Sequence, residues 1–531
     1  MLARLASVSA THGEEYGVGP PRRRALRLLD VGAILMLAAY AANGRASVPF
    51  HGDEATFLWL SRDAETLLAR DADALAFDAA SGPSQAQWLR VLNGSLAPLA
   101  IGLTWRGAGR SVRDLNGPWQ WHVPDSDPLA QWRVNVARGN RPDAASLGLA
   151  RLPSALATAA SVALVYVLAL ALSGRRGAAL LAAACFATTP AVLLNGRRAM
   201  QEGLFLLGTT LVVWVAYRTI RAQGRPSAET GWLIALGAAS GLALAAKHSA
   251  AVVVAAVLLA GLAAPWLRGH SARHTLPVHF ASLAGVALIA VAVFTLLVPV
   301  WWSLPRTLAL TGLAALAFAL RETRTRRTWR LSATAAALIA GAWLARPALP
   351  AETLALSSGL LEARRSLIER QISTFAGDDS ARRRVTLLLR EAFVAGPQYF
   401  EDPAWARFPE IQAQIEAYER SPWRGRGGGL AWGIPLAALA ASGGAAAWRR
   451  RRDPALVLLA AWLALPAFAL LANPLPWQRY YLVLHAPLAV LAGLGAAGWL
   501  RAASASMRSS RRIPKRVPGR SGSSPISSTG W

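Results

Sequence analysis

Two adjacent carboxylates, Asp53 and Glu54, follow directly after the first apolar stretch of the chain. Carboxylates at the edge of hydrocarbon are costly to keep there and commonly serve a function. A carboxylate beside a second one, in a partly desolvated cleft, gains proton affinity and suits general base catalysis. Asp53 could equally cap the helix that follows, with Glu54 in its first turn.

The elements that would position these carboxylates are membrane-spanning helices. The chain has 531 residues, of which 54% are hydrophobic, and its apolar stretches are long enough to cross about 30 Å of hydrocarbon. The sequence therefore predicts an all-α polytopic membrane protein with about twelve transmembrane helices. We expect them at about 27–46, 149–172, 178–195, 203–217, 231–247, 249–267, 278–300, 304–320, 331–345, 429–447, 454–472 and 480–499.

The net charge of +27 is explained by membrane topology without nucleic acid. With the N-terminus in the cytoplasm, the segments predicted inside hold 28 basic and 6 acidic residues. The loops 48–148 and 346–428, predicted outside, hold 21 basic and 22 acidic residues. This is the positive-inside bias of a plasma-membrane protein whose two termini are cytoplasmic. A cleaved signal peptide at 22–47 is the alternative, and it would leave residues 53 and 54 outside as well.

The two long outer loops are expected to form short helices. A helix from Asp53 to Arg70 has apolar residues at helical spacing, and Trp88–Trp105 is expected to be interfacial or re-entrant. The second loop suggests helices at Glu352–Ser373, Arg382–Val394 and Pro409–Arg420. The expected organisation is a cytoplasmic tail 1–26, a transmembrane core 27–345, the loop 346–428, C-terminal helices 429–500 and a basic disordered tail 501–531.

A set of charges lies at predicted outer helix ends, against the positive-inside trend. Each cation alone could snorkel to headgroups or cap a helix C-terminus. As a set on the face that carries Asp53, they favour an anionic substrate such as a phosphate or diphosphate at a lipid boundary. The set comprises Arg45, Arg151, Arg197, Arg198, Glu202, Lys247, Arg306 and Arg479.

Around these residues the chain resembles GT-C glycosyltransferases of the protein O-mannosyltransferase and aminoarabinose-transferase type, the family-39-like enzymes that depend on a lipid carrier. The order and sidedness of the matching motifs carry the resemblance. These motifs are Asp53-Glu54-Ala55-Thr56, Arg151–Leu156, Gly174–Ala179, Thr189-Pro190 before Gly196–Glu202, Gly241–Ala243 before Lys247, and Arg479-Tyr480-Tyr481-Leu482 with Pro487 and Leu491–Gly493.

The resemblance implies transfer of a sugar from a polyprenyl-phosphate carrier to an acceptor on the outer face of the membrane. Asp53 and Glu54 would then form the catalytic pair, with Asp53 as the base and Glu54 as its positioning or substrate-binding neighbour. Glu202 would be a second carboxylate that orients the sugar or the acceptor. The expected ligands of donor and phosphate are Arg198, Lys247, Arg479 and Tyr480, with Arg364, Arg365 and Gln371 as weaker candidates. We expect no metal and no cofactor besides the lipid-linked donor; the other partners are membrane lipids and an acceptor protein, lipid or glycan.

Two other functions stay open at this point. A transporter or flippase of an anionic lipid-linked glycan would use the same cations but needs polar groups at mid-membrane. An O-antigen-ligase-like transferase would use a diphosphate carrier and place its working residues in the second loop. Residues 364–371 therefore discriminate between the two kinds of transferase.

Overall fold

The computed structural model describes residues 20–301 except 72, 78–84, 122–127, 224–225 and 268–271, single residues between 358 and 371, and residues 380–510 except 474. Within these ranges the regular secondary structure is entirely helical. The predicted spans 304–320 and 331–345, Arg306, Arg364 and most of the predicted helix Glu352–Ser373 lie outside the described residues.

The described helices confirm an all-helical, multi-pass membrane protein. Seven of them are long and apolar enough to cross a membrane, and nine spans result if each of two bent helix pairs counts as one. The predicted span 278–300 corresponds to α15 (Ala272–Leu297), whose described apolar part, Ser282–Leu297, is shorter than a full span. The described residues thus support seven to nine of the twelve expected spans.

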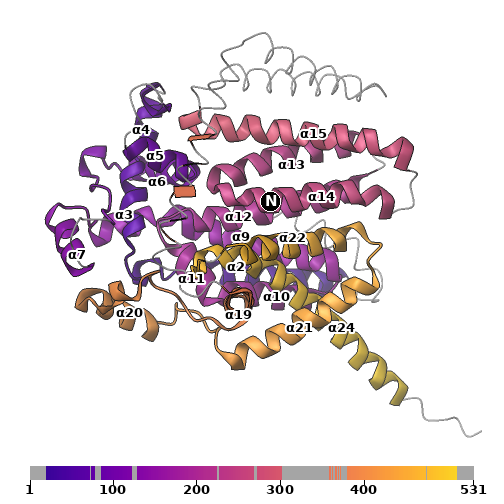
Figure 1. Cartoon of the computed structure of the whole chain (residues 1–531). Coiled ribbons are helices and arrows are strands. Elements are labelled where there is room, and N and C mark those ends of the chain that lie inside the picture. Colours follow the sequence, from indigo (N-terminus) through magenta and orange to yellow (C-terminus); the bar gives the residue numbers. More distant parts are fainter. Residues whose placement is uncertain are drawn as a thin grey trace, which may run out of the picture.

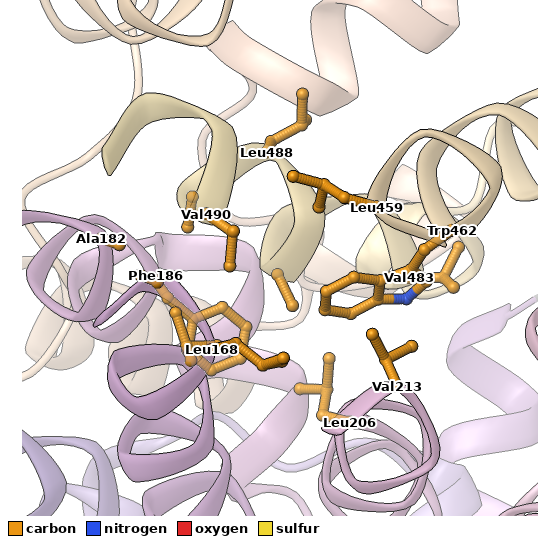
Figure 2. Packing of buried hydrophobic residues seen from close by; sticks show 14 of the residues in the cluster. Leu168, Ala182, Phe186, Leu206, Val213, Leu459, Trp462, Val483, Leu488 and Val490 are labelled. Atoms are coloured by element: carbon orange, nitrogen blue, oxygen red, sulfur yellow. The ribbon is translucent and has the colours of Figure 1, made fainter. Parts of the chain in front are cut away.

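The spans pack side by side in one bundle (Figure 1), and the span that contains α24 (His485–Ser510) is the most buried of them. In the most apolar window of the span that contains α24, 89% of the residues are buried, against 22% for α21 (Leu430–Arg449). Figure 2 shows part of the core, where Val490 lies toward Phe186 and Val483 lies beside Trp462. The remaining long helices are α2 (Pro20–Ala42), α9 (Leu152–Ser173), α12 (Glu202–Ala222), α13 (Pro226–Ala246), α14 (Ala251–Leu267) and α22 (Pro454–Leu471).

The predicted span 178–195 is broken in the middle. The helices α10 (Arg176–Thr188) and α11 (Pro190–Arg197) meet at an angle of 59°. Pro190 has no N–H to continue the helical ladder. The Thr188 carbonyl instead accepts the backbone N–H groups of Arg426 and Gly427, each at 3.2 Å. The loop before α21 thus supplies the hydrogen bonds of a carbonyl at the break.

The first loop, predicted outside, folds into short helices at one end of the bundle (Figure 1). The predicted helix 53–70 is divided into α3 (Gly52–Leu60) and α4 (Asp63–Leu68). The stretch 88–105 falls on α5 (Gln85–Leu92) and α6 (Leu96–Gly107), which are 8 and 12 residues long. Neither is long enough to span a bilayer. The loop also contains α7 (Pro128–Ala137) and α8 (Ala144–Ala150).

The second loop covers the first. Its helices are α19 (Ala381–Leu389), extended by a π-helical turn at Arg390–Val394, the 3-10 helix η8 (Pro403–Arg407) and α20 (Pro409–Arg420). This confirms the helices predicted at 382–394 and 409–420. Aromatic side chains of both loops form one buried cluster, in which Trp405 and Phe408 pack on Trp119 and Trp132. At the other end of the chain, α24 continues to Ser510, beyond the predicted end of its span.

Candidate functional site

A cavity of about 990 Å³ lies between the two loops and the bundle, and its wall changes character from one side to the other. The loops contribute Asp53, Trp121, Glu401 and other polar or aromatic side chains. The spans α14 and α22 contribute apolar groups such as Val252 and Leu470. A cavity of this size and mixed lining suits a ligand with a charged head and an apolar chain.

Asp53 reaches this cavity because of how helix α3 begins. The ring of His51 caps the helix: its Nδ1 accepts the backbone N–H of Asp53 at 3.2 Å. The Asp53 side chain is 22% exposed. One oxygen accepts a hydrogen bond from Trp121 Nε1 at 2.9 Å, and the other binds Nη1 of Arg479 at 2.5 Å. The predicted base therefore lies on the cavity, paired with a predicted phosphate ligand.

Arg479 is shared between two carboxylates. Its Nε lies 3.2 Å from Glu401 Oε1, and its guanidinium stacks 5.0 Å from the centre of the Trp477 ring. Glu401 also contacts His51 Nε2 at 2.9 Å. Burial by itself raises the pKa of Glu401, but the positive charge of Arg479 and the bond to His51 outweigh it and hold that pKa well below its usual range. Glu401 is therefore ionised at neutral pH.

Glu54 lies away from the cavity and is fully buried. Both of its oxygens bind Arg151, each at 2.7 Å. The same two oxygens also accept the backbone N–H groups of Ala199 at 2.7 Å and His51 at 3.0 Å. Four donors leave this carboxylate no free position for a proton or a substrate. The structure thus separates the two adjacent carboxylates, and of the two roles predicted for Glu54 the geometry favours positioning over substrate binding.

Lys247 reaches the cavity from the turn after α13. Its ammonium lies 3.0 Å from Glu202 Oε1, and 5.5 Å from the ring centres of Phe205 and Tyr480. Glu202 is fully buried behind it and is not part of the cavity wall. Its Oε2 has no hydrogen-bond partner among the described residues. Glu202 is therefore placed to orient Lys247 and not to touch a substrate directly.

Most of the predicted rim of cations is used inside the fold. Arg198 is buried outside the cavity wall and donates to the Tyr399 carbonyl at 2.6 Å. Arg197 donates to the carbonyls of Tyr40 and Ala41 at the C-terminal end of α2. Within the described ranges, Lys247 and Arg479 are the members of the set that line the cavity. Assigning charged residues to the two predicted sides of the membrane could not distinguish Lys247 and Arg479 from the other cations of the set.

The remaining predicted residues are divided in the same way. Tyr480 and Gln371 line the cavity, whereas Arg365 is 81% exposed and pairs with Glu369 one turn away. The residues that sequence reasoning missed are His51, Trp121, Gln201 and Glu401. A weak signal was available for Glu401, because Glu401-Asp402 is one of three adjacent acidic pairs in the loops predicted outside, with Asp53-Glu54 and Asp378-Asp379.

Comparison with known proteins supports the relationship that the motifs predicted. Residues 124–310 match the family of dolichyl-phosphate-mannose-protein mannosyltransferases. The matched region contains α9 to α15, and thus Glu202 and Lys247. No curated protein sequence matches the chain significantly.

Two groups of solved structures align with most of the chain at low similarity. The oligosaccharyltransferase AglB from Archaeoglobus fulgidus, solved with an inhibitory peptide and a dolichol-phosphate, aligns at 12% identity over 86% of this chain and 52% of that one, with a TM-score of 0.38. The chain thus spans about half the length of that enzyme. ArnT from Cupriavidus metallidurans, bound to undecaprenyl phosphate, aligns at 13% identity over 93% of this chain and 82% of that one, with a TM-score of 0.33.

Proposed function

We propose that this chain, whose residues 124–310 match the dolichyl-phosphate-mannose-protein mannosyltransferase family, is a membrane glycosyltransferase that transfers a sugar from a polyprenyl-phosphate donor to an acceptor hydroxyl on the outer face of the membrane. One observation carries the proposal. Asp53 and the cations Lys247 and Arg479 line one cavity, and apolar side chains from the spans α14 and α22 line the same cavity.

The cations would bind the donor by its phosphate. The donor is a phosphodiester between a sugar and a polyprenol, so its head is anionic and its chain is apolar. Arg479 and Lys247 can both donate to phosphate oxygens, and the apolar side chains of α14 and α22 can receive the first prenyl units. The same cations would stabilise the charge that develops on the leaving phosphate, so no strong general acid is required.

Asp53 would act as the general base. The acceptor oxygen forms a bond to the anomeric carbon as the bond from that carbon to the phosphate oxygen breaks. The proton of the acceptor hydroxyl passes to Asp53, and the electron pair of the broken bond leaves with the lipid phosphate. Trp121 holds one Asp53 oxygen, which fixes the direction of the carboxylate in the cavity.

The experiment that tests this function is transfer from a polyprenyl-phosphate sugar by purified Asp53→Asn. The variant keeps the shape of the side chain and its contacts with Trp121, so we expect native folding and a loss of turnover of about 10²- to 10⁴-fold. Asp114→Asn, the same change at an exposed carboxylate, is the matched control and should keep wild-type turnover. Turnover by Asp53→Asn at the wild-type rate would remove Asp53 from the mechanism.

The sidedness of the site can be tested by labelling single cysteines in a Cys185→Ala background. Ala137 and Arg452 are both exposed. Ala137 ends α7 in the first loop, and Arg452 lies in the turn between α21 and α22. The next residue of that turn, Asp453, pairs with Arg221 in the last turn of α12, at the opposite end of that span from Glu202. Cysteine at 137 should react with an impermeant maleimide on intact cells, and cysteine at 452 should react only after permeabilisation. The opposite pattern would place the site on the cytoplasmic side.

A transporter or flippase is supported less well. Transport needs polar groups along a path through the membrane. The buried hydroxyls of Ser161, Thr209 and Thr210 instead donate to carbonyls of their own helices. The charged groups of the site lie at helix ends, since Glu202 begins α12 and Lys247 follows α13. This arrangement suits chemistry at a membrane boundary.

An O-antigen-ligase-like transferase would place its main working residues at 364–371. Gln371 is on the cavity, but Arg365 is exposed and paired with Glu369. A comparison of monophosphate-linked and diphosphate-linked donors separates the two enzymes. We expect turnover with the monophosphate-linked sugar.

A further inference from the structure

Arg479 is held along two edges by two different carboxylates. Nη1 binds Asp53 at 2.5 Å, Nε binds Glu401 at 3.2 Å, and the face of the guanidinium rests on Trp477. A guanidinium has five N–H donors in a fixed plane, so one edge can exchange its partner while the other edge stays bound. The edge toward Asp53 and the edge toward Glu401 are therefore free to have different roles.

Glu401 is itself fixed to the start of the helix that carries Asp53. His51 Nδ1 accepts the Asp53 backbone N–H, so it carries no proton. The ring proton then lies on Nε2, from which it is donated to Glu401 Oε2 at 2.9 Å. The ring is 1% exposed and stacks on Phe400, which belongs to the same loop as Glu401. Through this ring, the distance between Glu401 and Asp53 is set by rigid contacts.

Resting on the function proposed above, we propose that Glu401 is a positioning residue that anchors Arg479 while the other edge of the guanidinium exchanges Asp53 for the donor phosphate. In the empty enzyme Asp53 then forms an ion pair with Arg479, and it loses this partner only when a phosphodiester is bound. Asp53 is thus released from its ion pair only while a donor is present, and in the empty site it stays bound to Arg479.

The charges around the exchange are arranged to permit it. Besides Asp53 and Glu401, the groups that face Arg479 electrostatically are Glu202 and Tyr480. Lys247 lies on the same cavity and forms an ion pair with Glu202. Arg198 interacts electrostatically with both Glu401 and Arg479, and it is not part of the cavity wall. A phosphodiester adds one negative charge beside two cations. The exchange leaves Asp53 without its ion pair, and the loss of a neighbouring cation favours proton binding by a carboxylate.

The direct test is proton uptake on binding of a phosphodiester, which needs no acceptor. The probe is farnesyl methyl phosphate, whose single charge does not change between about pH 4 and 7. Titration calorimetry of the purified full chain, in two buffers of different ionisation enthalpy, gives the protons taken up per ligand bound. We expect uptake by the wild type at mildly acidic pH and none by Asp53→Asn.

Two substitutions of Glu401 distinguish the effect of its negative charge from the effect of its side-chain length, and a third substitution in the same loop is the control. Glu401→Gln removes the negative charge beside Asp53, so uptake at a given pH should fall to less than half. Glu401→Asp keeps the charge but is one methylene too short for Arg479, so uptake should persist while affinity falls roughly tenfold. Glu410→Gln is the control: Glu410 is 59% exposed and pairs with Arg141 away from the cavity, and both quantities should stay unchanged.

If Glu401→Gln does not fold, His51→Asn provides the same test. Asparagine can still cap α3 but cannot reach Glu401, so uptake should change in the same direction by a smaller amount. Binding by the wild type without proton uptake, or unchanged uptake in folded Glu401→Gln, would overturn the exchange. Failure of the wild type to bind the probe would instead contradict the proposed donor site.

Discussion

The helix α3 carries two ion-pair sites of opposite character, one on each of two neighbouring residues. In the buried site, Glu54 is saturated by Arg151 and two backbone N–H groups, with no exposure to the cavity. In the cavity site, Asp53 is partly exposed and shares Arg479 with Glu401. The first arrangement has nothing left to offer a ligand, whereas the second can exchange one partner for another. The same pair of residue types thus stabilises the fold in one site and, in the function proposed above, takes part in the reaction in the other.

The largest effect that separates the two sites should come from Glu54→Gln. It leaves the buried charge of Arg151 without its partner, so we expect a loss of about 3–5 kcal/mol in unfolding free energy. Thermal unfolding in detergent measures this against Asp53→Asn, which should melt near the wild type. Glu54→Gln with a wild-type melting temperature and no turnover would instead return Glu54 to the catalytic group.

Lys247→Met tests a site of intermediate character, since Lys247 faces both buried Glu202 and the cavity. Loss of the ammonium should raise the KM for the donor roughly 10- to 100-fold through loss of a charge-assisted bond to phosphate. Glu202→Gln should give a smaller change, because the lysine stays. Equal effects of the two variants on KM would show that Glu202 itself contacts the donor.

Acid should lower the free energy of unfolding through protonation of Glu401. The pKa of this group is lower in the folded protein than in the unfolded chain, so its stabilisation is complete above the unfolded value, near 4.3, and is lost as the pH falls further. We expect a loss on the order of 2 kcal/mol as the pH drops from 5 toward the folded value. Glu401→Gln should be less sensitive to acid over the same range, as chemical denaturation at each pH would reveal. An equal slope for both proteins would contradict the assignment.

The smallest effect is expected for Trp121→Phe, which removes one donor to Asp53 and keeps the ring. The loss of one hydrogen bond to a charged oxygen should reduce turnover about 3- to 10-fold, with little change in KM for the donor. Trp132→Phe is the control, because Trp132 belongs to the same aromatic cluster and does not line the cavity. A similar loss in both variants would indicate that packing, and not the bond to Asp53, supports turnover.

The sequence predicted the spans and part of the site because each rests on a local signal. Apolar runs mark spans whatever they pack against, so most boundaries lie within a few residues of those observed. Asp53, Lys247, Arg479 and Tyr480 stand beside such runs, and all four line the cavity. Family motifs placed them in the right order along the chain.

What could not be predicted depends on direction and distant contacts. Successive residues of a helix point about 100° apart, so adjacency in sequence sends Asp53 and Glu54 to different surroundings. Glu401 lies 350 residues beyond His51, and only the folded chain brings them together. Arg197 and Arg198 had the same signal as Lys247, but their donors are used by carbonyls of α2 and of the second loop.

The break between α10 and α11 has a mechanical consequence for the loop that carries Glu401. At one end of this loop, Gln478 donates to the Gly396 carbonyl at 2.7 Å and accepts the N–H of Gln398 at 3.0 Å. At the other end, the N–H groups of Arg426 and Gly427 are bound to the Thr188 carbonyl that the break leaves open. The segment between these two ends, which contains Glu401, is therefore hydrogen-bonded to the bundle on both sides. The residues in the middle of this segment can therefore differ between related proteins, and with them the acceptors that fit the cavity, while the two anchored ends keep their positions.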